Sequence, residues 1–368
     1  MRRTRVDAVG EGTSLHDRKR RAGERVVLGF EGTGLSEDFR KVIHEVQPSG
    51  YIIFQRNIES PAQLLELTRE LRSLSDEHRP CILTIDQEGG RVQRVRAPAT
   101  IWPSARAVAA ADLVEQVSFA LAQELRAMGI DLNFAPVADV DSNPDNPVIG
   151  DRSFSATPDE VSRAVHAWIQ GHHRAGMGTC AKHFPGHGDT HLDSHLDLPT
   201  VEVDLETLQH REFPPFAAAV RSGVHAIMSA HVVFPAIDPT VPCTLSPRVM
   251  PDLLRRDLAF DGIVFSDDMD MKAIADRWPN AEAVRLANLA TVDTFLCCRE
   301  PARQLDMYEA LIHTQEQALE AEVHASESER RMATLREHLL LHTTRPPLSV
   351  LACDSHRELA ARVLSRTQ

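Results

Sequence analysis

Eight short apolar segments recur along the chain. They are nearly continuous in Val, Ile, Leu, Phe and small residues, without regular alternation of apolar and polar positions. This pattern is typical of strands buried on both faces of a parallel sheet. The segments are VVLGF (26–30), GYIIF (50–54), CILTI (81–85), DLNFAPV (131–137), GTCAKHF (178–184), HAIMSAHVV (225–233), GIVFS (262–266) and TFLCC (294–298).

Stretches of helical periodicity separate these segments. In PAQLLELTRELRSL (61–74) the leucines recur at a spacing that places them along one side of a helix. Similar patterns occupy residues 112–128, 158–175, 205–222 and 281–290. Strand followed by helix, eight times over, predicts a single (β/α)8 TIM-type barrel of class α/β. An open, doubly wound sheet is the alternative, because eight segments do not prove closure.

The barrel is predicted to span residues 25–342 as one catalytic domain. A basic tail, residues 1–24, precedes it. Residues 303–340 are predicted to be largely helical, and the RPP tripeptide at 345–347 separates them from a helical C-terminal appendage, residues 343–368.

Composition narrows the class of protein. Hydrophobic residues make up 42% of the 368 residues, which allows a large core, and the formal net charge of −13 argues against nucleic-acid binding. No apolar run approaches the roughly 18–20 residues of a membrane span. No apolar segment follows the basic N-terminus, and the six cysteines form no C-x-x-C pair. We expect a cytoplasmic protein with no membrane partner.

Polar side chains follow three of the predicted strands directly. Asp86 comes after the third segment, and Asp267 and Asp268 come after the seventh. After the fifth lies KHFPGHGDTHLDSHLDLP (182–199), with four histidines and three aspartates. Active sites of such barrels lie at the C-terminal ends of the strands, so this clustering is expected of an enzyme.

The 182–199 block admits three interpretations: a metal site, a solvated loop without a role, or acid/base chemistry. Its histidines recur every fourth residue, but Pro185, Gly186 and Gly188 disfavour a continuous helix that would align them as metal ligands. The unit Asp193-Ser194-His195 suits acid/base work, because a carboxylate beside an imidazole makes it a proton shuttle near neutral pH.

Other charged motifs have competing interpretations. The aspartates of SDDMDM (266–271) either cap a helix or supply a nucleophile or metal ligand at Asp267. In TIDQEGGRVQRV (84–95), Asp86 with Arg91 and Arg94 offers an acceptor and donors for sugar hydroxyls, or forms a salt-bridged loop. Arg152 in IGDRSF (149–154) is uninformative alone.

Taken together, KHFPGHGDTHLDSHLDLP, DQEGGRVQR, IGDRSF and SDDMDM resemble the glycoside hydrolase family 3 β-N-acetylglucosaminidases (β-N-acetylhexosaminidases) of bacterial peptidoglycan recycling. The likeness covers roughly residues 26–300, with the motifs in the family's order. It implies a (β/α)8 barrel and a retaining exo-hydrolase that releases N-acetylglucosamine from β-linked saccharides, including muropeptides.

The resemblance also implies roles for individual residues. Asp267 would be the nucleophile, His195 the general acid/base and Asp193 its partner. The residues that would hold the N-acetylglucosamine ring are Asp86, Arg94, Arg152, Lys182 and His183. No metal and no cofactor is expected, and the protein is expected to act as a monomer on a small carbohydrate or muropeptide. His187 and His191 have no assigned role.

Three alternatives to this hydrolase remain. A phosphorylase on the same scaffold would use the imidazole acid/base with phosphate as the attacking group. A metal-dependent hydrolase and a non-catalytic sugar-binding protein are the other two. We further hypothesise that Gly186 and Gly188 let the loop swing His195 over the bound sugar.

Overall fold

The computed structural model describes residues 13–191, 197–340 and 344–367. The eight predicted segments form a closed barrel of parallel strands in which β10 pairs with β1, and Val26 lies opposite Phe295. The predicted (β/α)8 barrel is therefore confirmed, and the open sheet is excluded. The barrel strands are β1 (Val26–Leu28), β2 (Gly50–Ile53), β3 (Ile82–Ile85), β6 (Leu132–Asn133), β7 (Gly178–Phe184), β8 (Ala226–Ser229), β9 (Ile263–Asp268) and β10 (Thr294–Cys297).

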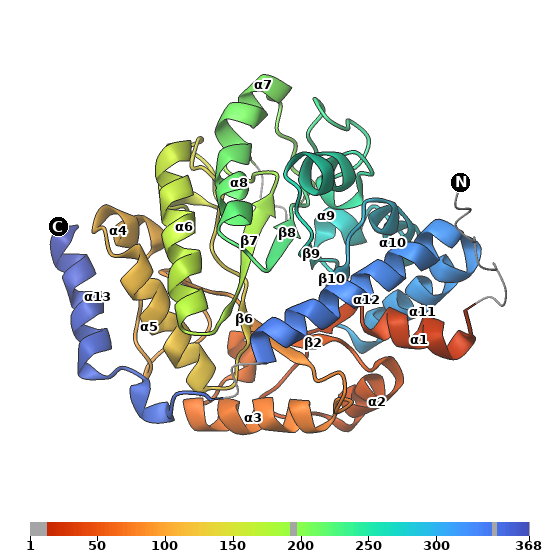
Figure 1. The fold of residues 1–368 in the computed structure, drawn as a ribbon, viewed down its shortest axis with the longest axis horizontal. Helices are drawn as coiled ribbons and strands as arrows, with labels where there is room; N and C mark the ends of the chain where they lie inside the picture. The colour runs from red at the N-terminus through yellow and green to blue at the C-terminus, as the bar shows by residue number, and fades with distance from the viewer. Residues whose placement is uncertain (1–12, 192–196, 341–343, 368) are drawn as a thin grey trace, which may run out of the picture.

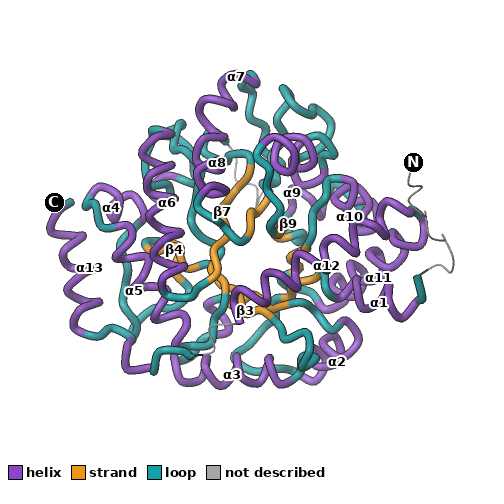
Figure 2. The backbone as a smooth tube through the Cα atoms, in the orientation of Figure 1, coloured by secondary structure: helices purple, strands orange, loops and turns teal. Residues whose placement is uncertain are grey.

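Helices surround the strands on the outside, as Figure 2 shows. The helical patterns predicted from the sequence are confirmed within a few residues. The main outer helices are α2 (Glu37–Val46), α3 (Pro61–Ser73), α5 (Val114–Ala127), α6 (Pro158–Arg174), α8 (Phe213–Arg221), α10 (Asn280–Leu289) and α11 (Pro301–Gln317). Between β8 and β9 the chain forms a π-helical segment, η5 (Val249–Asp257), and another, η3 (Leu208–Glu212), precedes α8.

Further helices, turns and a hairpin complete the fold. A hairpin of β4 (Gln87–Gly89) and β5 (Val92–Gln93) follows β3 directly. The remaining helices and 3-10 turns are α1 (Leu15–Gly23), η1 (Gln55–Asn57), α4 (Ala105–Ala110), η2 (Gly150–Arg152), α7 (Leu205–Thr207), η4 (Cys243–Leu245), α9 (Lys272–Ala275), α12 (Leu319–Leu340), η6 (Leu348–Val350) and α13 (Asp354–Arg366).

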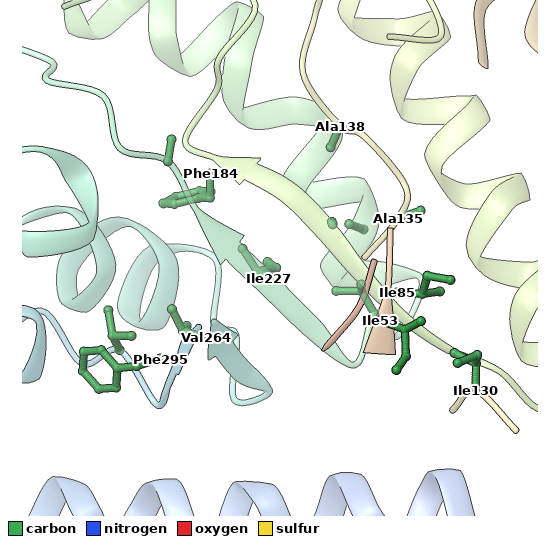
Figure 3. Close-up of a cluster of buried hydrophobic side chains, with 14 of the residues drawn as sticks. Ile53, Ile85, Ile130, Ala135, Ala138, Phe184, Ile227, Val264 and Phe295 are labelled. Atoms are coloured by element: carbon green, nitrogen blue, oxygen red, sulfur yellow. The ribbon is translucent and has the colours of Figure 1, made fainter. Parts of the chain in front are cut away.

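Alternate residues of each strand enter two separate hydrophobic clusters. One set faces outward to the helices and includes Ile53, Ile85, Ile227 and Val264 (Figure 3). The other set fills the barrel interior, where the rings of Phe134 and Phe265 meet edge to face with centroids 5.2 Å apart. Both faces of every strand are thus buried, which explains why the segments read as continuous apolar runs.

Helix α12 closes the N-terminal end of the barrel. Its Met332, Leu335 and Leu339 are buried in the same cluster as the interior strand residues. The predicted helical stretch 303–340 is in fact two helices, because the backbone turns at Ala318, where φ is −144°. The open end of the barrel is therefore the C-terminal end of the strands.

The two terminal helices pack on the outside of the barrel (Figure 1). Helix α1 contacts α11 and α12, and Arg21 in α1 pairs with Glu329 in α12. Helix α13 lies against α4 and α5, where His356 Nδ1 is 2.9 Å from the Glu124 carboxylate. Within the ranges given above, every helix is too short or too polar to cross a bilayer.

Candidate active site

A cavity of about 320 Å³ opens at the C-terminal ends of the strands. Its volume lies within the range of about 300–1,000 Å³ that is usual for small-molecule sites. All six predicted site residues that the structure describes line it: Asp86, Arg94, Arg152, Lys182, His183 and Asp267. A larger hollow of about 720 Å³ lies on the outer wall at α4, α5 and α6, but it contains none of these residues. We therefore take the strand-end cavity as the candidate active site.

A network of alternating charges forms one wall of the cavity. Lys182 Nζ, near the end of β7, lies 2.7 Å from an oxygen of Asp86 and 2.7 Å from an oxygen of Glu88. Glu88 also accepts two hydrogen bonds from Arg152, at 2.8 and 2.9 Å, and Arg94 lies 3.4 Å from Asp86. The bidentate geometry is the strong form of the arginine–carboxylate pair.

Burial alone would favour protonation of these two acids. The neighbouring cations outweigh it, so the pKa of Asp86 is lowered by Lys182 and Arg94, and the pKa of Glu88 is lowered by Arg152 and Lys182. Burial likewise disfavours the charged lysine, but Asp86 and Glu88 raise the pKa of Lys182. Two carboxylates thus face three cations, and the wall keeps ionised donors and acceptors ready for sugar hydroxyls.

The hairpin β4–β5 brings Glu88 and Arg94 to this wall. Its turn uses Gly89 and Gly90, both with positive φ (91° and 57°), and a side chain at either position would collide with the chain at residues 103–104. Arg91, which the motif also offered for sugar binding, instead donates to the carbonyls of Val148 and Ile149 and does not line the cavity.

His183 is held by a carboxylate that the sequence did not single out. Its Nδ1 lies 2.7 Å from Oδ2 of Asp139, which is fully buried on the segment after β6. The other oxygen of Asp139 accepts from the backbone N–H of His183 (3.1 Å) and of His187 (2.8 Å). His187 itself lines the cavity, and burial lowers its pKa to about 4, so the ring is neutral at physiological pH.

Hydrogen bonds and close packing hold the first residues of the 182–199 loop against the segment after β6. Asn146 donates from Nδ2 to the carbonyls of His187 and Gly188, both at 2.9 Å. A Cβ on Gly188 would come within 1.6 Å of the Val140 carbonyl oxygen, and one on Gly186 within 2.6 Å of a Glu212 oxygen. The two glycines are therefore needed for close packing, which the sequence could not distinguish from a hinge.

Asp267 stands at the C-terminal end of β9, on the barrel mouth. Its Oδ1 accepts the backbone N–H of Asp268 at 2.8 Å, and both residues line the cavity. The helix that follows, α9, begins after Met271 without a side-chain cap, so the aspartates do not serve as helix caps. Burial and the nearby Asp270 raise the pKa of Asp268 to about 7.

Asp193 and His195 lie outside the described residues, and their roles stay predictions. Their neighbour His191 lies 3.2 Å from Asn143 through Nδ1, so the described part of the loop ends against the segment after β6. Among the residues that the structure places, no group of three or more His, Cys, Asp or Glu side chains is arranged to hold a metal ion.

Comparison with known proteins identifies the family. A model described as "Glycosyl hydrolase family 3 N terminal domain" matches residues 25–335. The chain therefore belongs to glycoside hydrolase family 3, in agreement with the resemblance of its motifs. Within this family it is a hydrolase of the β-hexosaminidase type, because the curated relatives that it matches carry that name.

Three relatives illustrate the match. The chain is 41% identical over 286 residues to the β-hexosaminidase of Methylococcus capsulatus, which covers 76% of this chain and 84% of the relative. A glycoside hydrolase family 3 β-N-acetylglucosaminidase from Paenibacillus sp. str. FPU-7 superimposes with a TM-score of 0.89 at 36% identity, covering 95% of this chain and 68% of that one. NagZ from Neisseria gonorrhoeae, solved with N-trifluoroacetyl-D-glucosamine, gives 0.73 at 29% identity, covering 94% and 98%.

Proposed function

We propose that the protein is a retaining exo-β-N-acetylglucosaminidase. It removes a terminal, non-reducing N-acetylglucosamine from β-linked saccharides through a glycosyl-aspartate intermediate. The observation that carries this proposal is that Asp267 shares one cavity with the charged wall of Asp86, Glu88, Lys182 and Arg152. A carboxylate nucleophile and a set of hydroxyl-binding groups thus surround a space of sugar size.

In the proposed first step, Asp267 attacks the anomeric carbon while protonated His195 donates its proton to the leaving oxygen. In the second step, His195 takes a proton from water, which then releases the sugar with its configuration retained. Asp193 would orient the imidazole and favour its charged form. The hydrogen bonds from Asn146 to His187 and Gly188 support this assignment, because they hold the first part of the 182–199 loop beside the cavity that His187 lines.

A muropeptide with a lactyl carboxylate is the substrate that we propose. A neutral imidazole base avoids the repulsion that a second carboxylate would feel beside that group. Arg56 and Arg299 also line the cavity and offer positive charge to an anionic aglycone. All six cysteines are free thiols, which supports a reducing compartment and therefore the cytoplasm.

Hydrolysis of 4-nitrophenyl N-acetyl-β-glucosaminide tests the proposal. We expect the wild type to release nitrophenol and Asp267→Ala to lose at least about 10³-fold in kcat, as is usual when a nucleophile is removed. Asp306→Ala, a change on the exposed face of α11, is the matched control and should retain full activity. Thermal melting of all three proteins checks that folding is intact.

The product distinguishes the mechanisms. Proton NMR of the first-formed sugar should show the β-anomer. The α-anomer would disprove retention, and N-acetylglucosamine 1-phosphate formed in phosphate buffer would establish a phosphorylase instead. Loss of activity on chelation would support the metal-dependent alternative. Preference for N-acetylglucosaminyl-anhydro-N-acetylmuramic acid over chitobiose in kcat/KM tests the proposed aglycone.

A further inference from the structure

Asp139 is buried behind the cavity and contacts two residues that line it, His183 and His187. The carboxylate is fully shielded from solvent and is absent from the cavity lining. Its three hydrogen bonds go to the His183 ring at 2.7 Å and to the backbone N–H groups of His183 and His187 at 3.1 and 2.8 Å. Among the described residues, the ring of His183 is the cavity side chain to which Asp139 is hydrogen-bonded, so we expect its effect on a bound sugar to act mainly through that ring.

The charge on Asp139 determines which nitrogen of His183 carries the proton. Burial opposes ionisation, but the contacts with His183 keep the pKa of Asp139 below its usual value. An ionised carboxylate can only accept hydrogen bonds, so Nδ1 of His183 must be the donor. In the neutral ring, Nε2 is then an acceptor, and it has no hydrogen-bond partner within residues 13–191, 197–340 and 344–367.

The rest of the cavity makes such an acceptor useful. Lys182, Arg94 and Arg152 supply only donors, and each oxygen of Asp86 and Glu88 already accepts from at least one of these cations, so a sugar hydroxyl would have to share that acceptor. A sugar hydroxyl both donates and accepts, so it needs an acceptor as well as donors. Nε2 of His183 meets that need on a ring whose position is fixed.

We propose that Asp139 is a positioning residue that holds His183 in its Nδ1–H tautomer, so that Nε2 accepts a hydrogen bond from one hydroxyl of the sugar. This rests on the proposed function, which makes His183 a sugar-binding residue. A site of this kind rejects analogues that lack the hydroxyl, because the buried acceptor is then left without a donor.

Asp139→Asn reverses the tautomer while it preserves the shape of the side chain. The amide oxygen can still accept from the two backbone N–H groups, and the amide nitrogen then faces Nδ1 of His183. Since that nitrogen is a donor, Nδ1 must become the acceptor, and the ring proton moves to Nε2. The control is Asp293→Asn, which changes another fully buried aspartate that accepts a backbone N–H, at the opposite end of the barrel.

Nitrogen-15 NMR reads the tautomer directly. At pH 8, above the usual range for imidazole, the wild type and Asp293→Asn should show His183 protonated at Nδ1. Asp139→Asn should show it protonated at Nε2, with the resonance assigned by its loss in His183→Gln. An Nε2–H ring in the wild type would overturn the proposal.

Binding of monodeoxy and monodeoxyfluoro N-acetylglucosamines measures the consequence. In the wild type, one ring position should lose about 10–100-fold in affinity on deoxygenation, with no recovery on fluorination. In Asp139→Asn that loss should shrink to within about 3-fold, while other positions keep theirs, and KM should rise more than kcat falls. Equal losses in both proteins at every position would show that Asp139 is only structural.

The two proposals fail separately. A wild type that hydrolyses no β-N-acetylglucosaminide would defeat the proposed function. An active wild type whose deoxygenation losses do not depend on Asp139 would defeat only the inference about His183.

Discussion

Buried carboxylates pair with cations at both ends of the barrel, but the two clusters serve different purposes. At the N-terminal end, Asp293 is fully buried and pairs with Arg255 at 2.5 Å and Arg331 at 3.1 Å. At the C-terminal end, Glu88 is equally enclosed and pairs with Arg152 and Lys182. The second cluster lines the cavity at the C-terminal ends of the strands, together with the predicted site residues. In the first cluster, Arg255 and Arg331 border a different hollow of about 440 Å³, which contains none of the predicted site residues. Neither a buried ion pair nor a neighbouring hollow therefore marks an active site by itself, whereas the meeting of several predicted site residues at the strand ends does.

The residues that pair with the buried carboxylates also differ between the two ends of the barrel. The carboxylates of the closed end are held by arginines, with Asp131 bound by Arg72 and Arg345, both at 2.5 Å. The open end adds Lys182 and His183, whose hydrogen-bonding groups can turn from protein to ligand. Arginines can occupy the oxygens of a structural carboxylate through bidentate hydrogen bonds. Lysine and histidine can keep hydrogen-bonding groups available for a substrate.

The largest effect that separates the two ends is expected for Asp293→Asn. Loss of the charge leaves Arg255 and Arg331 with a weaker acceptor and should lower the free energy of unfolding by about 3–5 kcal/mol. The kcat of the folded fraction should match the wild type. Urea unfolding and active-site-normalised kinetics measure both quantities, and a loss of kcat greater than about 10-fold would contradict the division between the ends.

Glu88→Gln should reduce activity more than it reduces stability. The amide replaces an oxygen that faces donors on Arg152 and Lys182, so one cation loses its partner and both lose their fixed positions. We expect kcat/KM to fall about 10²-fold, with a smaller loss of unfolding free energy than in Asp293→Asn, because water in the cavity can solvate the freed cation. Steady-state kinetics and urea unfolding measure the two effects. A loss of unfolding free energy with unchanged kcat/KM would refute the prediction.

The smallest effect is a pH dependence at Asp268. Its pKa is raised to about 7 in the folded state, so the folded protein keeps a proton that the unfolded chain has lost between about pH 4 and 7. Asp268 therefore lowers the free energy of unfolding as the pH rises through that interval, and this loss of stability reaches its full size above about pH 7. Asp268→Asn should gain about 1–2 kcal/mol relative to the wild type at pH 8 and less at pH 5. The same gain at both pH values in thermal or urea unfolding would rule this out.

The fold could be predicted from the sequence because every barrel strand is buried on both sides. Segments such as 50–54 and 81–85 show this as unbroken apolar runs. The fourth strand is shorter than predicted, since regular pairing covers only Leu132–Asn133. Beyond it, Pro136 has no N–H to pair, and the run contacts β7 through an isolated bridge between Val137 and Lys182. The role of α12 as the barrel floor depends on contacts across the whole chain, which periodicity does not reveal.

The site was predictable only in part. Residues in strongly polar motifs, such as Asp86 and Lys182, were identified and do come together in the cavity. Glu88 and Asp139 were missed. Glu88 follows Asp86 two positions later in the same polar motif at a strand end, and this proximity would have suggested it. Asp139 is 44 residues from His183, and nothing local links them.

The placement of α12 bears on how the polypeptide is made. This helix follows all eight strands in the chain, yet its Met332, Leu335 and Leu339 form the floor beneath them. While a ribosome is still translating the strands, that apolar layer has no cover and is open to water or to chaperones. The last step of folding must therefore wait until residue 340 has emerged from the exit tunnel.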